Sequence, residues 1–338
     1  MHIVAGDIGG TSARLALFDA SGAVPRLLAQ TTYRSGAHPG IEPILADFLA
    51  AQAVRPAAIA LGVAGPVRGG VCRTTNLPWR LSVGAIAKAT GVARTWLLND
   101  LEAAAWGVET VAEADRVVLQ AGEPEPGGNQ SVVAAGTGFG EAGRVWADDH
   151  YRPFASEGGH ADFAPQDALD WAFQGWLGAR HGHVSWDRIV SGAGIVALHA
   201  FLRDHRGVAA PAALAEAMTA GDPAAAITAA ALARQDAVCV ETLDRFLRHF
   251  GAEAGNHALK LMATGGVFIT GGIAPKLLPR LKEGPFLDAF HAKGRMAALM
   301  RRMPVTVLTD GNAGLKGAAL FGRRRAERHP DDAAPGIP

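Results

Sequence analysis

Residues 3–17 read Ile3-Val4-Ala5-Gly6-Asp7-Ile8-Gly9-Gly10-Thr11-Ser12-Ala13-Arg14-Leu15-Ala16-Leu17, and this stretch determines the type of fold. An apolar run leads into Gly9-Gly10, which favour a turn, and a second strand-like run follows. The spacing predicts a β-hairpin over 2–18, with the carboxylate of Asp7 close to its turn.

Residues 131–146 repeat this design. Ser131-Val132-Val133-Ala134-Ala135 is followed by Gly136-Thr137-Gly138-Phe139-Gly140 and a return through Val145-Trp146. Two units of one design predict a duplicated core, with one copy in each of two domains.

The rest of the chain alternates helical and strand-like patterns. Short buried-strand runs lie at 59–63 and 96–98, and the stretch 167–250 is helix-rich. Further elements are a buried strand within 265–272, a last strand at 305–308 and a helix over 315–321. The class is therefore α/β.

Composition limits the possible partners. The chain has 338 residues, which suits two domains, and 49% of them are hydrophobic. Lys+Arg and Asp+Glu both number 32, so there is no charge excess that would favour nucleic acid or an anionic membrane. A small-molecule partner is the better expectation.

Cysteine usage and hydropathy indicate the compartment. Cys72 and Cys239 are far apart and form no CxxC motif, so we expect two small buried side chains and no disulfide or zinc site. The N-terminus has no signal-peptide pattern, and no apolar run reaches the length of a membrane span. We expect a cytoplasmic protein.

Three glycine-rich segments are candidates for a nucleotide site. Gly9-Gly10 would let backbone N–H groups approach phosphate oxygens, Thr11 would add a hydroxyl donor, and Asp7 is a suitable ligand for the Mg²⁺ that accompanies ATP. Each glycine turn alone could equally be an ordinary hairpin turn. Together with 265–272, which we expect against the adenosine, the turns at 9–10 and 136–138 favour a nucleotide held between domains.

Two polar segments are candidates for the acceptor site. Asp100 follows the apolar run Trp96-Leu97-Leu98-Asn99, at the strand end where α/β sheets bind ligands, although it could instead be a helix N-cap. Glu157 and His160, separated by two glycines, suit hydrogen bonds to neighbouring sugar hydroxyls. A metal site or a purely structural loop are the weaker alternatives for this segment.

Taken together, these motifs resemble the bacterial glucokinase family. The matching blocks keep their order from residue 3 to about 321, and the most specific is Glu157-Gly158-Gly159-His160-x-Asp162-Phe163-Ala164-Pro165. The other blocks are Asp7-Ile8-Gly9-Gly10-Thr11-x-Ala13-Arg14, Asn99-Asp100, Gly136-Thr137-Gly138-x-Gly140, Asp187 with Val190-Ser191-Gly192, and Gly265-Gly266-Val267-Phe268-Ile269-x-Gly271-Gly272-Ile273. The glycine turns alone fit any actin-like sugar kinase or ATPase. Clustered cysteines, typical of zinc-containing sugar kinases, are missing, and the hairpin begins too early for an N-terminal DNA-binding module.

The resemblance implies an actin-like ATPase fold of ribonuclease H-like topology, with an interdomain cleft. A small domain would comprise 2–110 and 301–321, a large domain 111–300, and 322–338 would be a frayed tail. It also implies a homodimer.

The resemblance further implies the ligands. Glucose would be held by Asn99, Asp100, Glu157, His160 and Asp187, with Asn76 at the edge of the site or in a structural turn before Pro78. ATP with Mg²⁺ would contact Asp7, Gly9, Gly10, Thr11, Gly136, Thr137, Gly138, Gly265, Gly266, Gly271 and Gly272, with Asp7 acting on Mg²⁺ through water. The family commonly has Glu in place of Asp187, so we expect somewhat weaker glucose affinity here.

The implied reaction is transfer of the ATP γ-phosphate to the 6-hydroxyl of glucose, with Asp100 as general base. Alternatives are a kinase for another hexose and a catalytically silent sugar sensor of the same fold. Intact glycine turns and the retained Asp100 argue against the sensor.

Overall fold

The computed structural model describes residues 1–74 and 77–328. It divides into two compact units. The first unit comprises Met1–Asp115, Tyr151–Ala155 and Asp310–Pro338, and the second comprises Arg116–His150 and Ser156–Thr309.

The first unit is built on a five-stranded sheet. Its order is β3-β2-β1-β4-β8. The strands are β1 (His2–Ile8), β2 (Ser12–Asp19), β3 (Arg26–Arg34), β4 (Ala58–Val63) and β8 (Thr95–Asn99). β1, β2 and β3 are antiparallel, whereas β1, β4 and β8 run parallel, which confirms the hairpin expected over 2–18.

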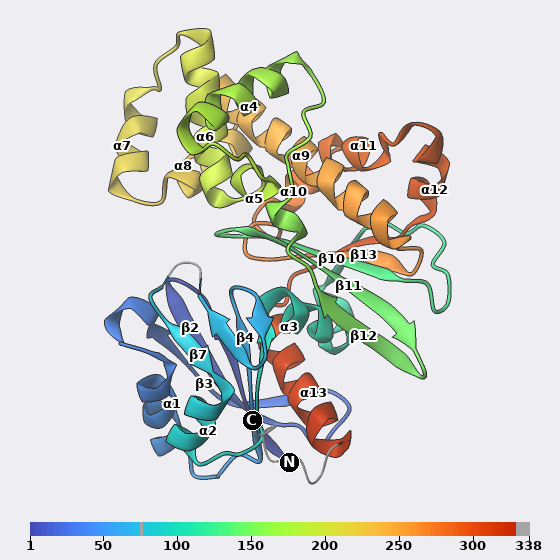
Figure 1. The fold of residues 1–338 in the computed structure, drawn as a ribbon. Helices are drawn as coiled ribbons and strands as arrows, with labels where there is room; N and C mark the ends of the chain where they lie inside the picture. Colours follow the sequence, from blue (N-terminus) through green and yellow to red (C-terminus); the bar gives the residue numbers. More distant parts are fainter. Residues whose placement is uncertain (75–76, 329–338) are drawn as a thin grey trace. The chain divides into compact units, whose positions relative to one another are not determined.

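Helices cover both faces of this sheet (Figure 1). Along β1, Val4 joins one core with α1 (Ile41–Ala50) and α2 (Val83–Thr90), while Ile3 and Ala5 join the other with α3 (Asp100–Gly107) and α13 (Ala313–Arg328). The alternation follows from the two-residue period of a strand. Short strands β5 (Val67–Arg68), β6 (Val71–Arg73) and β7 (Arg80–Ser82) form a separate small sheet.

Glycines let α3 and α13 approach closely. A Cβ atom at Gly317 would lie 1.9 Å from the Ala103 carbonyl oxygen, and one at Gly107 would lie 2.0 Å from that of Ala313. The pair therefore holds α13 against the helix that begins at Asp100.

The second unit repeats the strand order of the first. The six-stranded sheet runs β12-β11-β10-β13-β14-β9, with β10 and β11 antiparallel and β10, β13 and β14 parallel; its strands belong to the second unit except for Tyr151–Ala155 of β12. The bounds are β9 (Arg116–Gln120), β10 (Gln130–Ala135), β11 (Phe139–Ala147), β12 (His150–Ala155), β13 (Gly266–Thr270) and β14 (Val305–Leu308). The hairpin expected over 131–146 is confirmed, and its five-strand pattern matches that of the first sheet, with β9 as an extra antiparallel strand.

A large helical layer completes the second unit (Figure 1). The 25-residue helix α9 (Ala237–Leu261) supplies much of its core, including Phe246 and Phe250. The other helices are α4 (Ala168–His181), α5 (Trp186–Ile189), α6 (Gly192–Arg206), α7 (Ala212–Ala220), α8 (Pro223–Leu232), α10 (Leu278–Leu281), α11 (Pro285–His291) and α12 (Ala297–Arg302). Single 3₁₀ turns lie at Ser35–Ala37, Val108–Thr110, Glu113–Asp115, Gly158–His160 and Gly294–Met296.

The unit boundaries differ from those expected from the sequence. Residues 301–309 were expected in the small domain, but β14 pairs with β13 and β9 and so lies in the second unit. The tail expected to fray from 322 is helical as far as Arg328, where Gly322 and Ala326 are buried. The remainder, 329–338, lies outside the described residues.

Candidate functional site

The first glycine turn joins β1 and β2. The Gly9 N–H donates to the Ser12 carbonyl at 3.0 Å, and Ser35 Oγ donates to the Gly9 carbonyl at 2.9 Å. The Ser35 N–H donates to the Thr11 carbonyl at 3.1 Å. The turn is thus fixed by a neighbouring segment, while Gly10 and Thr11 remain partly or fully exposed.

Asp7 forms an ion pair beside this turn. Its Oδ2 accepts from Arg14 Nη2 at 2.5 Å and from Nε at 3.2 Å. Arg14 also donates to the Gly311 carbonyl at 2.9 Å. The guanidinium therefore orients Asp7 and neutralises part of its charge.

Asn99 and Asp100 lie at the carboxyl end of the parallel strands, which is the end of the sheet that carries the Gly9-Gly10 turn. β1, β4 and β8 end in register at Ile8, Val63 and Asn99, so the end of β8 is about 10 Å from that of β1. Asn99 is the N-cap of α3, and its Oδ1 accepts from the N–H groups of Leu101 and Glu102. The alternative in which Asp100 caps the helix is therefore wrong: Asp100 is the first helical residue, half-buried, and its Oδ1 accepts from the Leu101 N–H.

A helix N-terminus stabilises a carboxylate at this position, because the unpaired N–H groups carry partial positive charge. Asp100 therefore lies at a helix N-terminus, at the end of the sheet that also carries the Gly9-Gly10 turn. Asn76, the remaining sugar-site candidate of this unit, lies outside the described residues.

The second glycine turn joins β10 and β11. The Gly136 N–H donates to the Gly138 carbonyl at 2.8 Å, which closes the turn. Gly271 adopts a φ of +90°, and a Cβ atom there would lie 2.4 Å from the Ala135 carbonyl oxygen. Only glycine allows this approach, and it brings Gly271-Gly272 next to Gly136.

Gly265 and Gly266 lie elsewhere. They stand at the start of β13, whereas Gly271 and Gly272 follow its end, a separation of about 17 Å for a five-residue strand. A Cβ atom at Gly265 would lie 2.2 Å from the Gly128 carbonyl oxygen. The structure therefore does not bring this pair to the turn at 136–138, and close packing on Gly128 accounts for Gly265.

Glu157 and His160 flank a 3₁₀ turn that packs on Phe139. A Cβ atom at Gly159 would lie 2.2 Å from the Phe139 carbonyl oxygen, and one at Gly158 would lie 2.0 Å from Glu141 Oε2. The two glycines thus bring the turn close to β11 and leave Glu157 and His160 exposed, with 3.9 Å between Glu157 Oε2 and His160 Nε2. Exposed side chains of this kind are available to a ligand.

Asp187, on α5, lies at the same place. Residues 161–163 pair with 184–186 through the Phe163 and Trp186 N–H groups, which sets α5 beside the Glu157–His160 turn. Asp187 Oδ1 accepts from the Phe139 N–H at 2.7 Å. The glycine turn, the Glu157–His160 turn and α5 therefore meet at Phe139.

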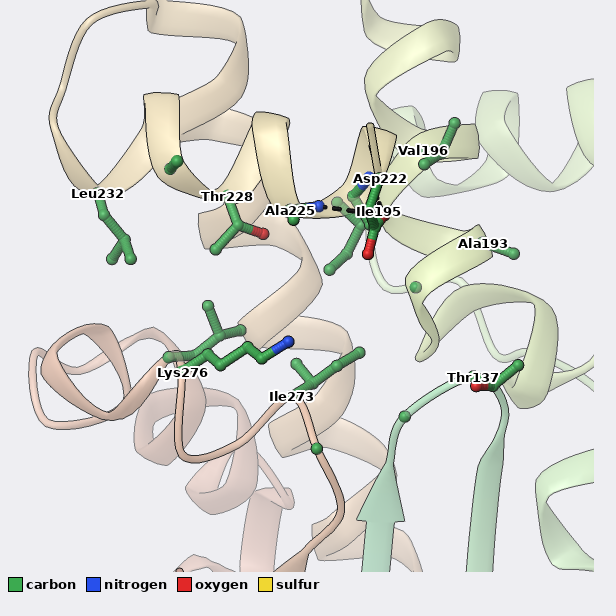
Figure 2. A pocket seen from close by; sticks show the side chains of 16 residues that line it. Thr137, Ala193, Ile195, Val196, Asp222, Ala225, Thr228, Leu232, Ile273 and Lys276 are labelled. Atoms are coloured by element: carbon green, nitrogen blue, oxygen red, sulfur yellow. Dashed lines mark hydrogen bonds between the residues drawn. The ribbon is translucent and has the colours of Figure 1, made fainter. Parts of the chain in front are cut away.

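A cavity of about 590 Å³ opens on the second glycine turn (Figure 2). Gly136, Thr137 and Gly272 line it, together with apolar residues from α6 and α8. Three further polar side chains were not identified from the sequence. They are Asp222, Thr228 and Lys276.

The sequence contained partial signals for these residues. Gly221-Asp222-Pro223 has the pattern of a helix start, and Asp222 Oδ1 indeed caps α8 by accepting from the Ala224 N–H. Lys276 follows Gly271-Gly272 closely, and Figure 2 shows its ammonium group extending into the cavity. The volume and mostly apolar lining of the cavity suit a heteroaromatic base and ribose.

A buried acidic pair lies beneath the Glu157–His160 turn. Glu141 is 1% exposed, and the carboxylate of Glu253, on α9, faces it within hydrogen-bonding reach. Burial and the Glu253 charge raise the pKa of Glu141 to about 8. His257 beside it has its pKa lowered by burial to about 4, and its Nδ1 pairs with Ser131 Oγ at 2.7 Å.

The residues present fit Mg²⁺ as an outer-sphere partner of Asp7. Mg²⁺ keeps most of its waters and takes few protein ligands when it accompanies phosphates. Asp7 offers one oxygen beyond the one held by Arg14, which suits a water-mediated contact. Elsewhere among the described residues, His199, Asp236 and Cys239 converge, but the Arg203 guanidinium already donates to both His199 and Asp236.

The two sheets define the class. A 3-2-1-4-5 order with an antiparallel hairpin and parallel strands, present in both units, is the ribonuclease H-like topology of actin-like sugar kinases, as the resemblance implied.

Comparison with known proteins identifies the family. The glucokinase family model matches residues 4–325. A glucokinase of Nostoc punctiforme is 37% identical over 337 residues, covering 95% of this chain and 99% of the relative. The chain belongs to the glucokinase family.

Solved structures agree with this assignment. A glucokinase from an Antarctic psychrotroph superimposes with a TM-score of 0.81 at 33% identity, covering 96% of this chain and 99% of its own. A ROK family glucokinase from Streptomyces griseus, solved with glucose and AMPPNP, has a TM-score of 0.66 at 22% identity and covers 96% and 100%. The latter supports the fold alone.

Among residues 1–74 and 77–328, no helix combines the length and the apolar character needed to cross a membrane.

Proposed function

We propose that the protein transfers the γ-phosphate of ATP to the 6-hydroxyl of D-glucose. The observation that carries this proposal is the cavity formed by Gly136, Thr137 and Gly272, in a chain of the glucokinase family whose first unit presents Asp100 at a strand edge. The cavity accommodates the nucleoside, and the glycine turn offers backbone donors to its phosphates.

Asp100 acts as the general base. It accepts the proton of the 6-hydroxyl as that oxygen attacks the γ-phosphorus, and it orients the hydroxyl for in-line displacement. Asn99 caps α3, so Asp100 stands at the first helical position, directly after the carboxyl end of β8. Its negative charge is stabilised by the helix N-terminus.

Each unit has a glycine turn suited to donate to phosphate oxygens. Gly9, Gly10 and Thr11 form that of the first unit, and Gly136, Thr137 and Gly138 that of the second. Mg²⁺ bound with ATP would neutralise phosphate charge, with Asp7 as a partner through water. Lys276 donates to the nucleotide, whereas Gly265 and Gly266 have a structural role.

Sugar hydroxyls are held by exposed polar groups. Glu157 accepts hydrogen bonds, His160 donates or accepts, and Asn99 and Asp187 complete the set. Asn76 is retained as a candidate on sequence grounds. We also propose that the chain forms a homodimer.

The test is a coupled assay of glucose 6-phosphate formation on wild type and Asp100→Asn. We expect kcat to fall by about 10²–10⁴-fold in the variant, the contribution of a general base, while the glucose dissociation constant stays within a few-fold. Fructose, mannose and N-acetylmannosamine serve as competing acceptors. If one of these sugars is phosphorylated in preference to glucose, that sugar is the substrate. Sugar binding without any turnover would instead identify a sensor.

A further inference from the structure

The second glycine turn is fastened to the segment that contains α5 and the start of α6. The Phe139 N–H, directly after the turn, donates to Asp187 Oδ1 at 2.7 Å. The Gly192 N–H donates to the Gly136 carbonyl at 2.9 Å, at the turn's other end. One short segment of chain therefore holds both ends of the turn.

The contact with Asp187 is close as well as polar. A Cβ atom at Gly138 would lie only 2.6 Å from Asp187 Oδ1. Trp186 and Ile189, on either side of Asp187, are 2% and 1% exposed, so α5 is anchored in the core. The buried neighbours of Asp187 thus hold its carboxylate in place, and the carboxylate in turn holds the Gly136–Gly138 turn through the Phe139 N–H.

We propose that Asp187 is a positioning residue for the Gly136–Gly138 turn and sets the affinity for the phosphoryl donor. This inference rests on the proposed kinase function. It differs from the sugar-binding role suggested by sequence, because one carboxylate oxygen is committed to the turn. The other oxygen remains for a sugar hydroxyl, so a single residue links acceptor and donor sites.

Removing this acceptor has a defined consequence. Without it, the Phe139 N–H loses its partner, and the turn must reorder each time that phosphates bind. Asparagine keeps an oxygen at the same position and loses only the charge. Alanine loses both, so the two variants separate positioning from charge.

The experiment measures ATP KM at saturating glucose and glucose KM at saturating ATP for Asp187→Ala, Asp187→Asn and Asp204→Ala. Asp204 is an exposed aspartate near the end of α6 and serves as the matched truncation. We expect ATP KM to rise about tenfold in Asp187→Ala, the usual effect of losing a hydrogen bond to a charged group. It should stay within about twofold of wild type in Asp187→Asn and Asp204→Ala.

A direct titration of each protein with ATP-Mg²⁺, without sugar, distinguishes this inference from the proposed function. If wild type shows no turnover, the proposed function fails, and the titration still tests whether Asp187→Ala weakens nucleotide binding. Unchanged ATP affinity in Asp187→Ala, with a raised glucose KM, would overturn the inference and leave Asp187 as a sugar ligand only. If Asp187→Ala does not fold, Asp187→Asn and Gly138→Ala are compared instead. The methyl group that Gly138→Ala introduces displaces the Asp187 carboxylate from the turn. Equal ATP affinity in Gly138→Ala and wild type would then also overturn it.

Discussion

Glu141→Gln should make the protein less sensitive to alkaline pH. Glu141 is buried beneath the Glu157–His160 turn, and its Oε1 has no hydrogen-bond partner among the described residues. A protonated Glu141 carries no charge that needs a buried donor. Glutamine, which is neutral at every pH and carries an N–H donor, imitates the protonated acid.

The groups around Glu141 keep it protonated. From α9 it faces the Glu253 carboxylate, the Lys260 ammonium, which lies 3.4 Å from Glu253 Oε1, and His257 Nε2 at 3.9 Å. Lys260 favours ionisation, but burial and the Glu253 charge outweigh it, and His257 is neutral at pH 7 because burial lowers its pKa to about 4. The pKa of Glu141 in the folded protein is therefore about 8, against 4.5 for an ordinary glutamate.

The proton on Glu141 makes the stability of the folded protein depend on pH. Between pH 4.5 and 8 the folded protein holds this proton and the unfolded chain does not, so unfolding releases it and stability falls as pH rises. Each pH unit in this window corresponds to about 1.4 kcal/mol. From pH 6 to pH 8, wild type should lose about 2 kcal/mol relative to Glu141→Gln, because the loss levels off near the folded pKa.

The assay is thermal unfolding at pH 6, 7 and 8, with Glu216→Gln, an exposed glutamate on α7, as the matched control. For a unit of this size the difference corresponds to about 4–8 °C in Tm between wild type and Glu141→Gln over that range. Glu216→Gln should follow wild type. Parallel curves for wild type and Glu141→Gln would refute the reasoning, since they would mean that Glu141 is ionised in the folded protein.

Two other changes test the cavity and the helix packing. Lys276→Ala removes the ammonium group that extends into the cavity, and ATP KM should rise about tenfold with glucose KM unchanged in the coupled assay; an equal rise in both would argue against a nucleotide contact. Gly317→Ala places a methyl group 1.9 Å from the Ala103 carbonyl oxygen and should destabilise the first unit by about 1–3 kcal/mol in urea unfolding. Gly314→Ala, on the same helix with open space around it, should instead stabilise by up to about 1 kcal/mol, and similar destabilisation by both would contradict the packing argument.

Local patterns in the sequence predicted the two hairpins because, within each hairpin, all the signals lie within a few residues of one another. An apolar run, a glycine turn and a returning strand need no distant partner to be recognised, and β1–β2 and β10–β11 pair as expected. Asp100 was correctly placed at a strand end for the same reason. The sequence left open whether Asp100 caps the following helix, because aspartate is a good N-cap residue, and the hydrogen bonds of Asn99 decide against it.

The parts of the site that the sequence did not predict depend on contacts between distant segments. Gly265-Gly266 and Gly271-Gly272 look alike in one motif, but the strand between them carries the two pairs to opposite ends of the sheet. Asp187 and Phe139 are far apart in the chain, and their hydrogen bond exists because 161–163 pairs with 184–186. The same junction explains Gly158 and Gly159: they permit the turn that carries the exposed Glu157 and His160 to lie directly over Phe139 and over the buried side chain of Glu141. A sugar held by Glu157 and His160 would therefore rest on the residues that fix the nucleotide turn, which gives a physical route for the acceptor to influence the donor.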